Sequence, residues 1–350
     1  MQKKLIALAV AGLASSAVFA ADNVTIYGRM DLGYLNQSGN SGGVQNVNSK
    51  GSIASGLQSG SRIGFKGSED LGNGLKAIFQ AEFGTAIDQT SATSTAATWV
   101  NRNSYVGLTG GFGTVVGGRL DGVRYGIFNK YDAFAGGTVG NFTQMTGQVD
   151  RADNAIAYIS PNFNGFTATL AYATNIAGPE NAGNRNDLRL NTLMVNYENG
   201  PLSLTADYET VKSVEETAAN VDVKVTTLAG SYNFGVVKLS ALWDRHEADV
   251  GSVNTVDYRD WFISALAPIG NTGFTLKATY GKVDDKLAAN ADGTKFGLGV
   301  DYALSKRTNL YADFGKISNK NGAMYQVSAV ANANGNNGVR GFDIGIAHKF

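Results

Sequence analysis

The sequence predicts an all-β fold, a 16-stranded antiparallel transmembrane β-barrel with short turns at one rim and long loops at the other. Three observations predict it. Apolar side chains alternate with polar or small ones from residue 24 onward, and short and long connections alternate along the chain. The composition is rich in turn-forming and aromatic residues but poor in proline, with 45 Gly, 17 Phe, 15 Tyr and only 4 Pro in 350 residues. These features are typical of short strands that close into a cylinder within a membrane.

The first twenty residues differ from the rest of the chain. Two lysines precede an apolar stretch over residues 5–14, and small side chains follow it. This is the pattern of a secretory signal peptide. Ala20 supplies the small side chain that a signal peptidase requires just before its cut. The sequence therefore predicts a signal peptide over residues 1–20 and a barrel domain over residues 21–350.

The last segment shows the alternation most clearly. Phe342, Ile344 and Ile346 fall on one face, and Asp343 and Lys349 fall on the other. The same period of two recurs over residues 75–83, 202–209, 274–280 and 295–304. A period of two predicts strands with one apolar face. Alternation alone is also compatible with a soluble sandwich, so the connections have to decide between the two folds.

The connections alternate between short and long. The short ones, rich in Gly, Asn and Pro, lie at 72–74, 111–113, 161–165, 199–201, 233–235, 268–273 and 305–308. The long ones lie at 38–60, 88–98, 122–150, 176–186, 213–221, 251–256, 287–293 and 321–337. Seven short turns and eight long loops imply sixteen strands, with both termini at the short-turn, periplasmic rim.

The charge balance excludes several classes of protein. The chain has 29 basic and 29 acidic residues, a formal net charge of zero, and no cysteine. A neutral chain has no overall field to attract nucleic acid, and the lack of thiols excludes disulfides and thiolate metal sites. No run of about eighteen apolar residues follows the predicted signal peptide, which excludes a helical membrane protein. A closed barrel still satisfies every backbone group in a bilayer.

Two groups of residues could suggest chemistry other than transport. Asp244 and His246 share a face near the end of a predicted strand, but the sequence supplies no nucleophile or second acid in matching geometry. Asp284, Asp285 and Asp292 lie near a loop and could hold a divalent cation, although unpaired surface acids are more common. The sequence therefore predicts neither an enzyme nor a cofactor or metal.

Several motifs, in this order and spacing, resemble those of the general diffusion porins of Gram-negative bacteria, most closely the type found in Neisseria, Burkholderia and their relatives. They are Val24–Gly28, Ser61–Gly67, Glu69–Gly74, Arg102–Leu108 leading into Gly111–Gly113, the pair Gly118 and Arg119, and the terminal Phe350. The resemblance spans the chain after the signal peptide. It implies a homotrimer in outer-membrane lipid, with a water-filled channel for passive diffusion of ions and small hydrophilic solutes and a third extracellular loop, residues 122–150, folded into the barrel.

Side-chain parity predicts which charges line the lumen, which is too wide for side chains to fill in a barrel of this size. If the apolar side chains of the first strand face lipid, Arg29 and Arg62 face inward. Arg102 is also expected to face inward, because Tyr105 falls on the opposite face and is expected to point outward. The same reasoning, with Ile156 on the outer face, places Arg151 inside. Arg119 is expected to join them. By resemblance, Arg29, Arg62, Arg102 and Arg151 match the basic wall across from the third loop; we use "basic wall" for these four residues and Arg119. Alternatively, the arginines only solvate a wet lumen and pair with acids such as Asp31.

The 122–150 connection carries the opposing charges. We expect Arg124, Lys130 and Asp132 to line the constriction from this side. In relatives that prefer cations, the loop carries a carboxylate just before a Phe-Gly-Gly element, whereas the matching stretch here is Ala133–Gly137 and only Asp132 is near it. Because arginines outnumber loop carboxylates, the sequence predicts a weak preference for anions.

The C-terminus carries the last predicted site. By resemblance, Phe350 at the end of an amphipathic strand is the signal that the barrel assembly machinery recognises. Two alternatives to a general porin stay open at this point. One is a solute-specific porin, and the other is an outer-membrane enzyme or adhesin on the same barrel.

Overall fold

The structure is a computed structural model that describes residues 24–39, 47–88, 99–180, 187–213, 220–328 and 338–350. The predicted signal peptide, residues 1–20, lies outside these ranges. Within them, no helix has the length and the apolar character needed to cross a bilayer.

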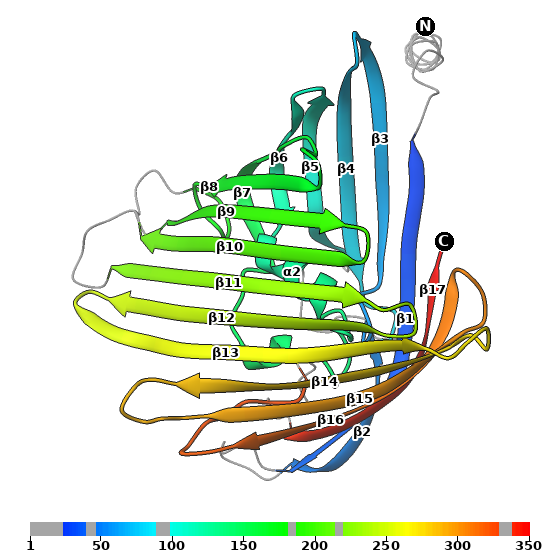
Figure 1. The fold of residues 1–350 in the computed structure, drawn as a ribbon, viewed down its shortest axis with the longest axis vertical. Helices are drawn as coiled ribbons and strands as arrows, with labels where there is room; N and C mark the ends of the chain where they lie inside the picture. The colour runs from blue at the N-terminus through cyan, green and yellow to red at the C-terminus, as the bar shows by residue number, and fades with distance from the viewer. Residues whose placement is uncertain (1–23, 40–46, 89–98, 181–186, 214–219, 329–337) are drawn as a thin grey trace, which may run out of the picture.

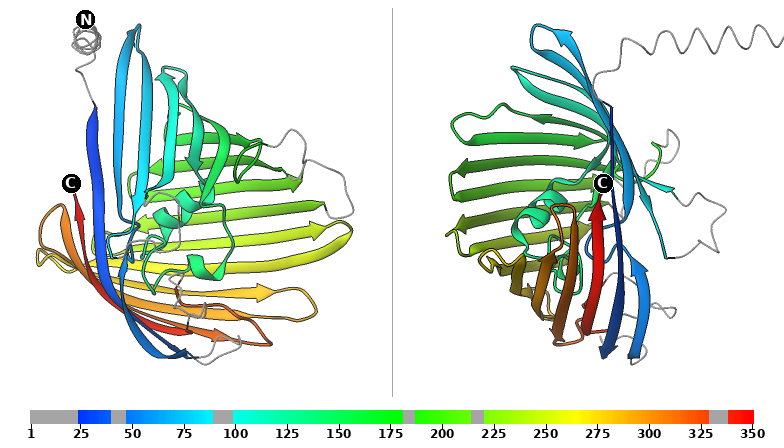
Figure 2. Two further views of the ribbon diagram at one scale, coloured as in Figure 1. Left: turned by 180° about the vertical axis from the view of Figure 1, so that it is seen from behind. Right: turned by 90° about the vertical axis from the view of Figure 1, so that its right-hand side faces the viewer.

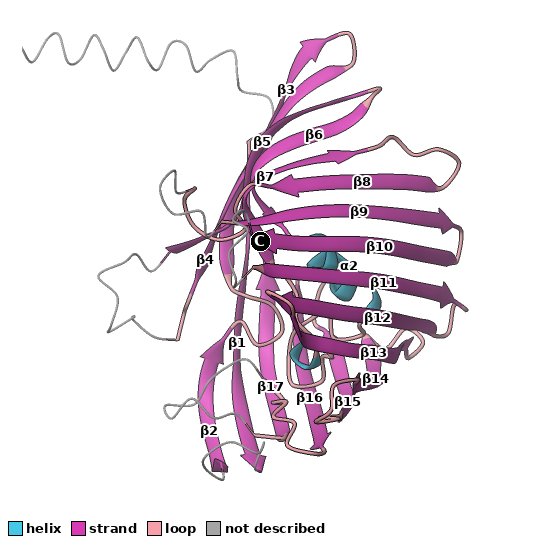
Figure 3. Cartoon of the chain, turned by 90° about the vertical axis from the view of Figure 1, so that its left-hand side faces the viewer, coloured by secondary structure: helices cyan, strands magenta, loops and turns pink. Residues whose placement is uncertain are grey.

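Strands make up nearly all of the described chain (Figures 1 and 3). They are β1 (Thr25–Gly39), β2 (Val47–Ser55), β3 (Arg62–Gly72), β4 (Leu75–Thr85), β5 (Trp99–Gly110), β6 (Gly113–Asp121), β7 (Arg151–Ile159), β8 (Phe166–Ala173), β9 (Leu188–Asn199), β10 (Leu202–Ser213), β11 (Val221–Asn233), β12 (Lys238–Val250), β13 (Val253–Pro268), β14 (Phe274–Asp285), β15 (Gly293–Ala303), β16 (Thr308–Asn319) and β17 (Arg340–Lys349). The described part also contains a helix, α2 (Val123–Tyr131), and a short 3-10 helix, η2 (Thr143–Met145).

The strands form one closed antiparallel barrel. From β3 to β17 each strand pairs with the next, and β17 pairs with β1, so that Arg29 lies opposite Lys349 and closes the cylinder. The sheet has 17 strands, but β2 and β3 are two parts of one barrel strand, because β1 pairs with β3 over its first part and with β2 over its second. The predicted 16-stranded antiparallel barrel is confirmed.

The break between β2 and β3 was not predicted. Residues 56–61, which we call the inner turn, leave the sheet at Gly56, whose φ of 75° favours glycine. Strand β2 lies within the predicted long connection 38–60, which is therefore wrong: β1 runs on to Gly39 and strand structure resumes at Val47. Small and polar residues fill most of β2, so it shows no period of two.

The predicted short turns all connect consecutive strands, as at Gly200 between β9 and β10. A second predicted long connection, 251–256, is also wrong. Only residues 251 and 252 separate β12 from β13, and Asn254 already pairs with Asp249. Polar side chains fill this hairpin end, so its composition resembles that of a loop.

The two faces of the wall differ as the alternation predicts. Ile344 and Ile346 are exposed on the outside, whereas Asp343 between its apolar neighbours is fully buried inside. The 122–150 connection lies on this inner side: Figure 1 shows α2 behind β9–β12, and the reverse view in Figure 2 shows it in front of them. Phe128 and Phe142 of the connection pack on Phe262 of β13, so the main apolar core lies between the connection and the wall.

Candidate functional site

Asp132 fixes the shape of the 122–150 connection. Its carboxylate accepts hydrogen bonds from the backbone N–H groups of Phe134 at 3.0 Å and Phe142 at 2.7 Å, and from the Thr279 hydroxyl at 3.1 Å. Burial raises the pKa of Asp132, and these three donors partly offset that rise. The side chain is only 3% exposed. The prediction that Asp132 lines the constriction is therefore wrong: its carboxylate holds the connection together and does not face permeating solutes.

Arg124 fastens α2 to the wall. Its guanidinium donates to Thr227 Oγ1 at 3.2 Å, to the carbonyl oxygen of Gly147 at 2.5 Å and to Asp244 Oδ2 at 2.5 Å, and its Nη2 lies 3.1 Å from His246 Nε2. Burial lowers the pKa of Arg124, but the nearby carboxylates, Asp244 foremost, outweigh burial and leave that pKa raised. The side chain is only 1% exposed, so its predicted place in the constriction is wrong as well.

Glycines in the wall let the tip of the connection lie directly on the strands. A Cβ atom on Gly315 would stand 2.0 Å from the carbonyl oxygen of Val139, and one on Gly297 would stand 2.4 Å from that of Gly140. The backbone N–H of Val139 donates to Asp343 Oδ2 at 2.8 Å. Backbone therefore packs on backbone here, and any larger side chain would displace the tip.

We expect Gly315→Ala to push the tip of the connection toward the channel, because the added methyl group collides with backbone that cannot rotate away. Overpacking of this kind costs about 1–3 kcal/mol. Single-channel conductance in a planar bilayer should fall and the unfolding temperature should drop. Gly111→Ala is the matched control, since a Cβ there meets nothing within 4 Å. Equal conductance and stability for the two variants would contradict the expectation.

Two of the basic-wall residues share one carboxylate. Glu82 of β4 lies 2.6 Å from Nε of Arg102 and 3.6 Å from Nε of Arg62, and it also accepts a hydrogen bond from Tyr27 at 3.1 Å. Glu82 was not among the predicted site residues, although it contacts two of them. It lies between the outward-facing Ala81 and Phe83, so the parity argument that placed the arginines could have found it.

Arg29 and Arg151 lie on either side of that pair. Arg29 donates to Gln58 Oε1 of the inner turn at 2.5 Å and lies 3.7 Å from Asp31. Arg151 pairs with Asp121 at 3.0 Å, and its guanidinium lies 5.3 Å from the ring centre of Tyr125 of α2. The inner turn and α2 thus both reach the basic wall, and neither contact was visible in the sequence.

Arg102 faces inward for a reason other than the one predicted. Ser104 pairs with Ala81 but Asn101 pairs with Phe83, so a bulge sets Arg102 and Asn103 together opposite Glu82. Tyr105 lies on the same inner face, where its hydroxyl approaches Gln80 at 3.5 Å. The predicted opposition of Tyr105 and Arg102 is wrong, because a bulge changes parity within a strand.

Among the described residues, Arg119 pairs with a carboxylate other than those of the four remaining basic-wall residues. Its neighbour Leu120 and the paired Ala152 are buried on the inner side, where they pack near Val149 of the 122–150 connection. A register shift lies between Gly118 and Leu120, so alternation does not fix the face of Arg119, and its place in the lumen stays a prediction. Its guanidinium forms an ion pair with Asp153 and donates from Nε to the carbonyl oxygen of Asn101 at 3.0 Å.

Lys130 lies in the last turn of α2, at the opposite side of the barrel. Its ammonium group pairs with Glu198 of β9 at 2.8 Å, and its carbonyl oxygen accepts a hydrogen bond from Lys238 at 3.0 Å. Both side chains of the Lys130–Glu198 pair are partly exposed, so this pair contributes little to stability.

Known proteins share both the family and the fold of this chain. A family model described as Gram-negative porin matches residues 7–322. The chain belongs to the Gram-negative porin family. It is 32% identical over its full length to the outer membrane porin protein 32 of Delftia acidovorans, all of which is covered, and 28% identical to the major outer membrane protein P.IB of Neisseria lactamica, also covering both chains fully. Among solved structures, an anion-selective porin from Comamonas acidovorans matches with a TM-score of 0.79 and 30% identity, covering 94% of this chain and 99% of that one.

The porin is therefore an outer-membrane channel for passive diffusion and not an enzyme. Passive diffusion breaks no bond, so its selectivity depends on the width of the lumen and on the charges that face it.

The acidic group of the porin between β14 and β15 does not offer a free cation site. Lys282 lies 3.2 Å from Asp284 and 3.0 Å from Asp292. Asp285 accepts hydrogen bonds from the backbone N–H groups of Leu287 at 3.0 Å and Ala291 at 2.8 Å. These carboxylates hold the turn and pair with lysine.

Proposed function

We propose that this porin prefers anions weakly and that Arg29, Arg62, Arg102 and Arg151 set the preference. One observation carries the proposal: the single carboxylate of Glu82 serves both Arg62 and Arg102. The four arginines form ion pairs with three carboxylates among the described residues, those of Asp31, Glu82 and Asp121, so these pairs leave one positive charge over. A low-dielectric wall around water strengthens the field of such a charge.

The nearby charges support this assignment. The carboxylate of Asp31 is fully buried and accepts hydrogen bonds from two backbone N–H groups of the inner turn, those of Gln58 and Ser59, and from the hydroxyl of Tyr311. Its charge is therefore directed into the protein. The similar porin from Comamonas acidovorans is described as anion-selective, which is consistent with the same preference here.

Glu82→Gln tests the proposal. The amide removes the one negative charge between two guanidinium groups, so the preference for anions should rise. A unit charge at 4 Å in water changes the energy of an ion by about 1 kcal/mol, so we expect the chloride to potassium permeability ratio to rise by about fivefold. Reversal potentials in a potassium chloride gradient measure it. Asp153→Asn is the control, because it removes a carboxylate that pairs with Arg119 and not with Arg62 or Arg102. A wild-type channel that prefers potassium would refute the proposal.

We further propose that the 122–150 connection narrows the channel, that residues 1–20 are removed on export, and that the porin is a homotrimer that passes small hydrophilic solutes. The contacts of Asp132 and Arg124 with the inner wall support the first, and family membership supports the others. Liposome swelling with sugars and carboxylates of graded size would distinguish a general from a solute-specific porin.

We also propose that the barrel assembly machinery recognises Phe350. The backbone N–H of Phe350 donates to the carbonyl oxygen of Gly28, and the N–H of Gly28 donates to that of Phe350, both at 3.1 Å, so the terminal residue completes the last strand. Phe350→Ala should lower the amount of folded barrel in outer membranes without changing the conductance of the channels that do form.

A further inference from the structure

A cluster of buried carboxylates lies where α2 meets the wall. Asp207 and Glu209 of β10, Asp244 of β12 and Asp260 of β13 are all at most 3% exposed. Arg124 is the guanidinium among them, and it bonds directly to Asp244 only. Four acids and one arginine leave the cluster short of positive charge, and buried charges that lack compensation are costly.

Several carboxylate oxygens of this cluster also lack donors. Only the Thr146 hydroxyl approaches Asp260 as a donor, and no described residue gives a hydrogen bond of ordinary geometry to either oxygen of Asp207 or to Oδ1 of Asp244. Buried polar groups are almost always hydrogen-bonded, so oxygens of this kind point to a further partner. Asp260 is fully buried, and its Oδ2 is aimed at His246.

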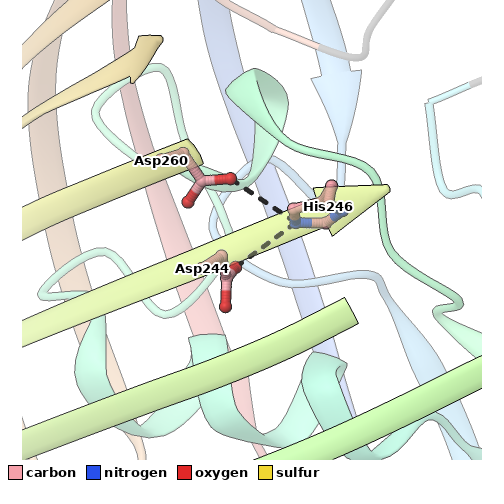
Figure 4. Close-up of side chains that lie close together, drawn as sticks. All are labelled: Asp244, His246 and Asp260. Carbon is pink, nitrogen blue, oxygen red and sulfur yellow. Dashed lines mark ion pairs between the residues drawn. The ribbon is translucent and has the colours of Figure 1, made fainter. Parts of the chain in front are cut away.

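The geometry around His246 fits a metal ion (Figure 4). Nε2 of His246 lies 3.6 Å from Asp244 Oδ2 and 3.5 Å from Asp260 Oδ2, and one ligand atom from each of the three residues lies within 4.8 Å of the others. Bonds of about 2.0–2.1 Å in a tetrahedral zinc site place neighbouring ligand atoms roughly 3.4 Å apart. The hydroxyl of Thr146 lies 3.1 Å from the same nitrogen, close enough to supply or orient a fourth ligand.

The guanidinium of Arg124 can move aside to make room for an ion. Its Nη2 now bonds to Asp244 Oδ2 and approaches His246 Nε2, while Nε and Nη1 hold Thr227 and the carbonyl oxygen of Gly147. Because Oδ1 of Asp244 has no partner, Nη2 can move to that oxygen and free both Oδ2 and Nε2. A divalent ion and one guanidinium then oppose four carboxylates, which leaves the cluster close to neutral.

We propose that Asp244, His246 and Asp260 bind a zinc ion that fastens the 122–150 connection to the barrel wall. One imidazole nitrogen with carboxylate oxygens is a ligand set that suits zinc. Gly147, whose backbone bonds to Arg124 and Tyr258 beside the site, is exposed. The ion reaches one end of the connection at Thr146, and its ligand Asp244 holds Arg124 at the other end, so its binding makes the connection more rigid.

Zinc binding can be measured on the whole folded chain without reference to transport. Untagged protein refolded in detergent and stripped with a chelator is dialysed against zinc chloride, and bound zinc is determined by mass spectrometry. We expect one ion per chain. His246→Gln and Asp260→Asn should each weaken binding by at least about tenfold, the lower range seen when even supporting groups of a metal site are removed. Asp260→Asn removes a charge from a cluster already short of compensation, so this variant should fold.

The second histidine of the chain supplies the matched control. His348 lies at the other end of the barrel wall, where its Nδ1 bonds to Thr308 at 2.8 Å. His348→Gln should bind zinc like the wild type, and zinc should raise the unfolding temperature of both but not of His246→Gln. No bound zinc at neutral pH, or equal binding by wild type and His246→Gln, would overturn the proposal. Neither result bears on the anion preference, which reversal potentials measure separately.

Discussion

Arg62 and Arg102, both replaced by glutamine, should turn the channel from a preference for anions to a preference for cations. The double substitution removes two positive charges and leaves Glu82, which paired with both of them, as an unopposed carboxylate facing the lumen. At about 1 kcal/mol per unit charge near the ion path in water, two charges amount to about 2 kcal/mol, so the permeability ratio of chloride to potassium should fall by on the order of thirtyfold. High salt should reduce the change, because it screens exposed charges.

Reversal potentials across planar bilayers measure this effect, with Arg119→Gln as the matched control. Arg119 is also an arginine paired with a carboxylate, but its partner is Asp153 and not Glu82. Its substitution should leave the permeability ratio unchanged. A ratio that stays constant in the double variant, or that moves as far in Arg119→Gln, would place the charge filter elsewhere.

Arg124→Met should release the foot of the 122–150 connection. Methionine keeps much of the side-chain volume but leaves Asp244 buried without the guanidinium that neutralises it. Breaking a buried ion pair by removing one partner costs about 3–5 kcal/mol. The loss should appear as faster proteolysis within the connection and a lower unfolding temperature of the detergent-folded barrel.

Lys130→Met is the control for that substitution. It breaks the ion pair with Glu198 at the end of the same helix, but this pair is partly exposed, and surface pairs contribute about 1 kcal/mol or less. If both variants resist proteolysis equally, the contacts of Arg124 do not hold the connection in place.

The sequence predicted the barrel well because a membrane wall imposes a strict period. In strands such as β17, with Ile344 outside and Asp343 inside, the alternation marks both the length of the strand and the face on which each side chain lies. Strand β2 escaped prediction because its residues are mostly small or polar, so neither face is marked. The same holds at the rim end of β13, where polar residues such as Asn254 resemble a loop.

The charge filter was less predictable, for two physical reasons. Bulges change side-chain parity without any signal in composition. Arg102 and Tyr105 therefore lie on the same face, although strict alternation would place them on opposite faces. The 122–150 connection has no period at all, and only its packing against the wall buries Arg124 and Asp132. Two of the eight predicted constriction residues, Arg124 and Asp132, accordingly lie away from the lumen.

The pairing of β1 with β17 also determines when the barrel can close. Arg29 needs Lys349 opposite it, and Gly28 needs the terminal residue itself. A chain still attached to a ribosome or a translocation pore lacks those partners and keeps an open sheet edge, which tends to pair with other chains. The barrel can therefore close only after the whole chain has been synthesised and released. Until then another factor must shield the open edge of the sheet. If synthesis is blocked at its very last step, the product should be aggregates and not shorter channels.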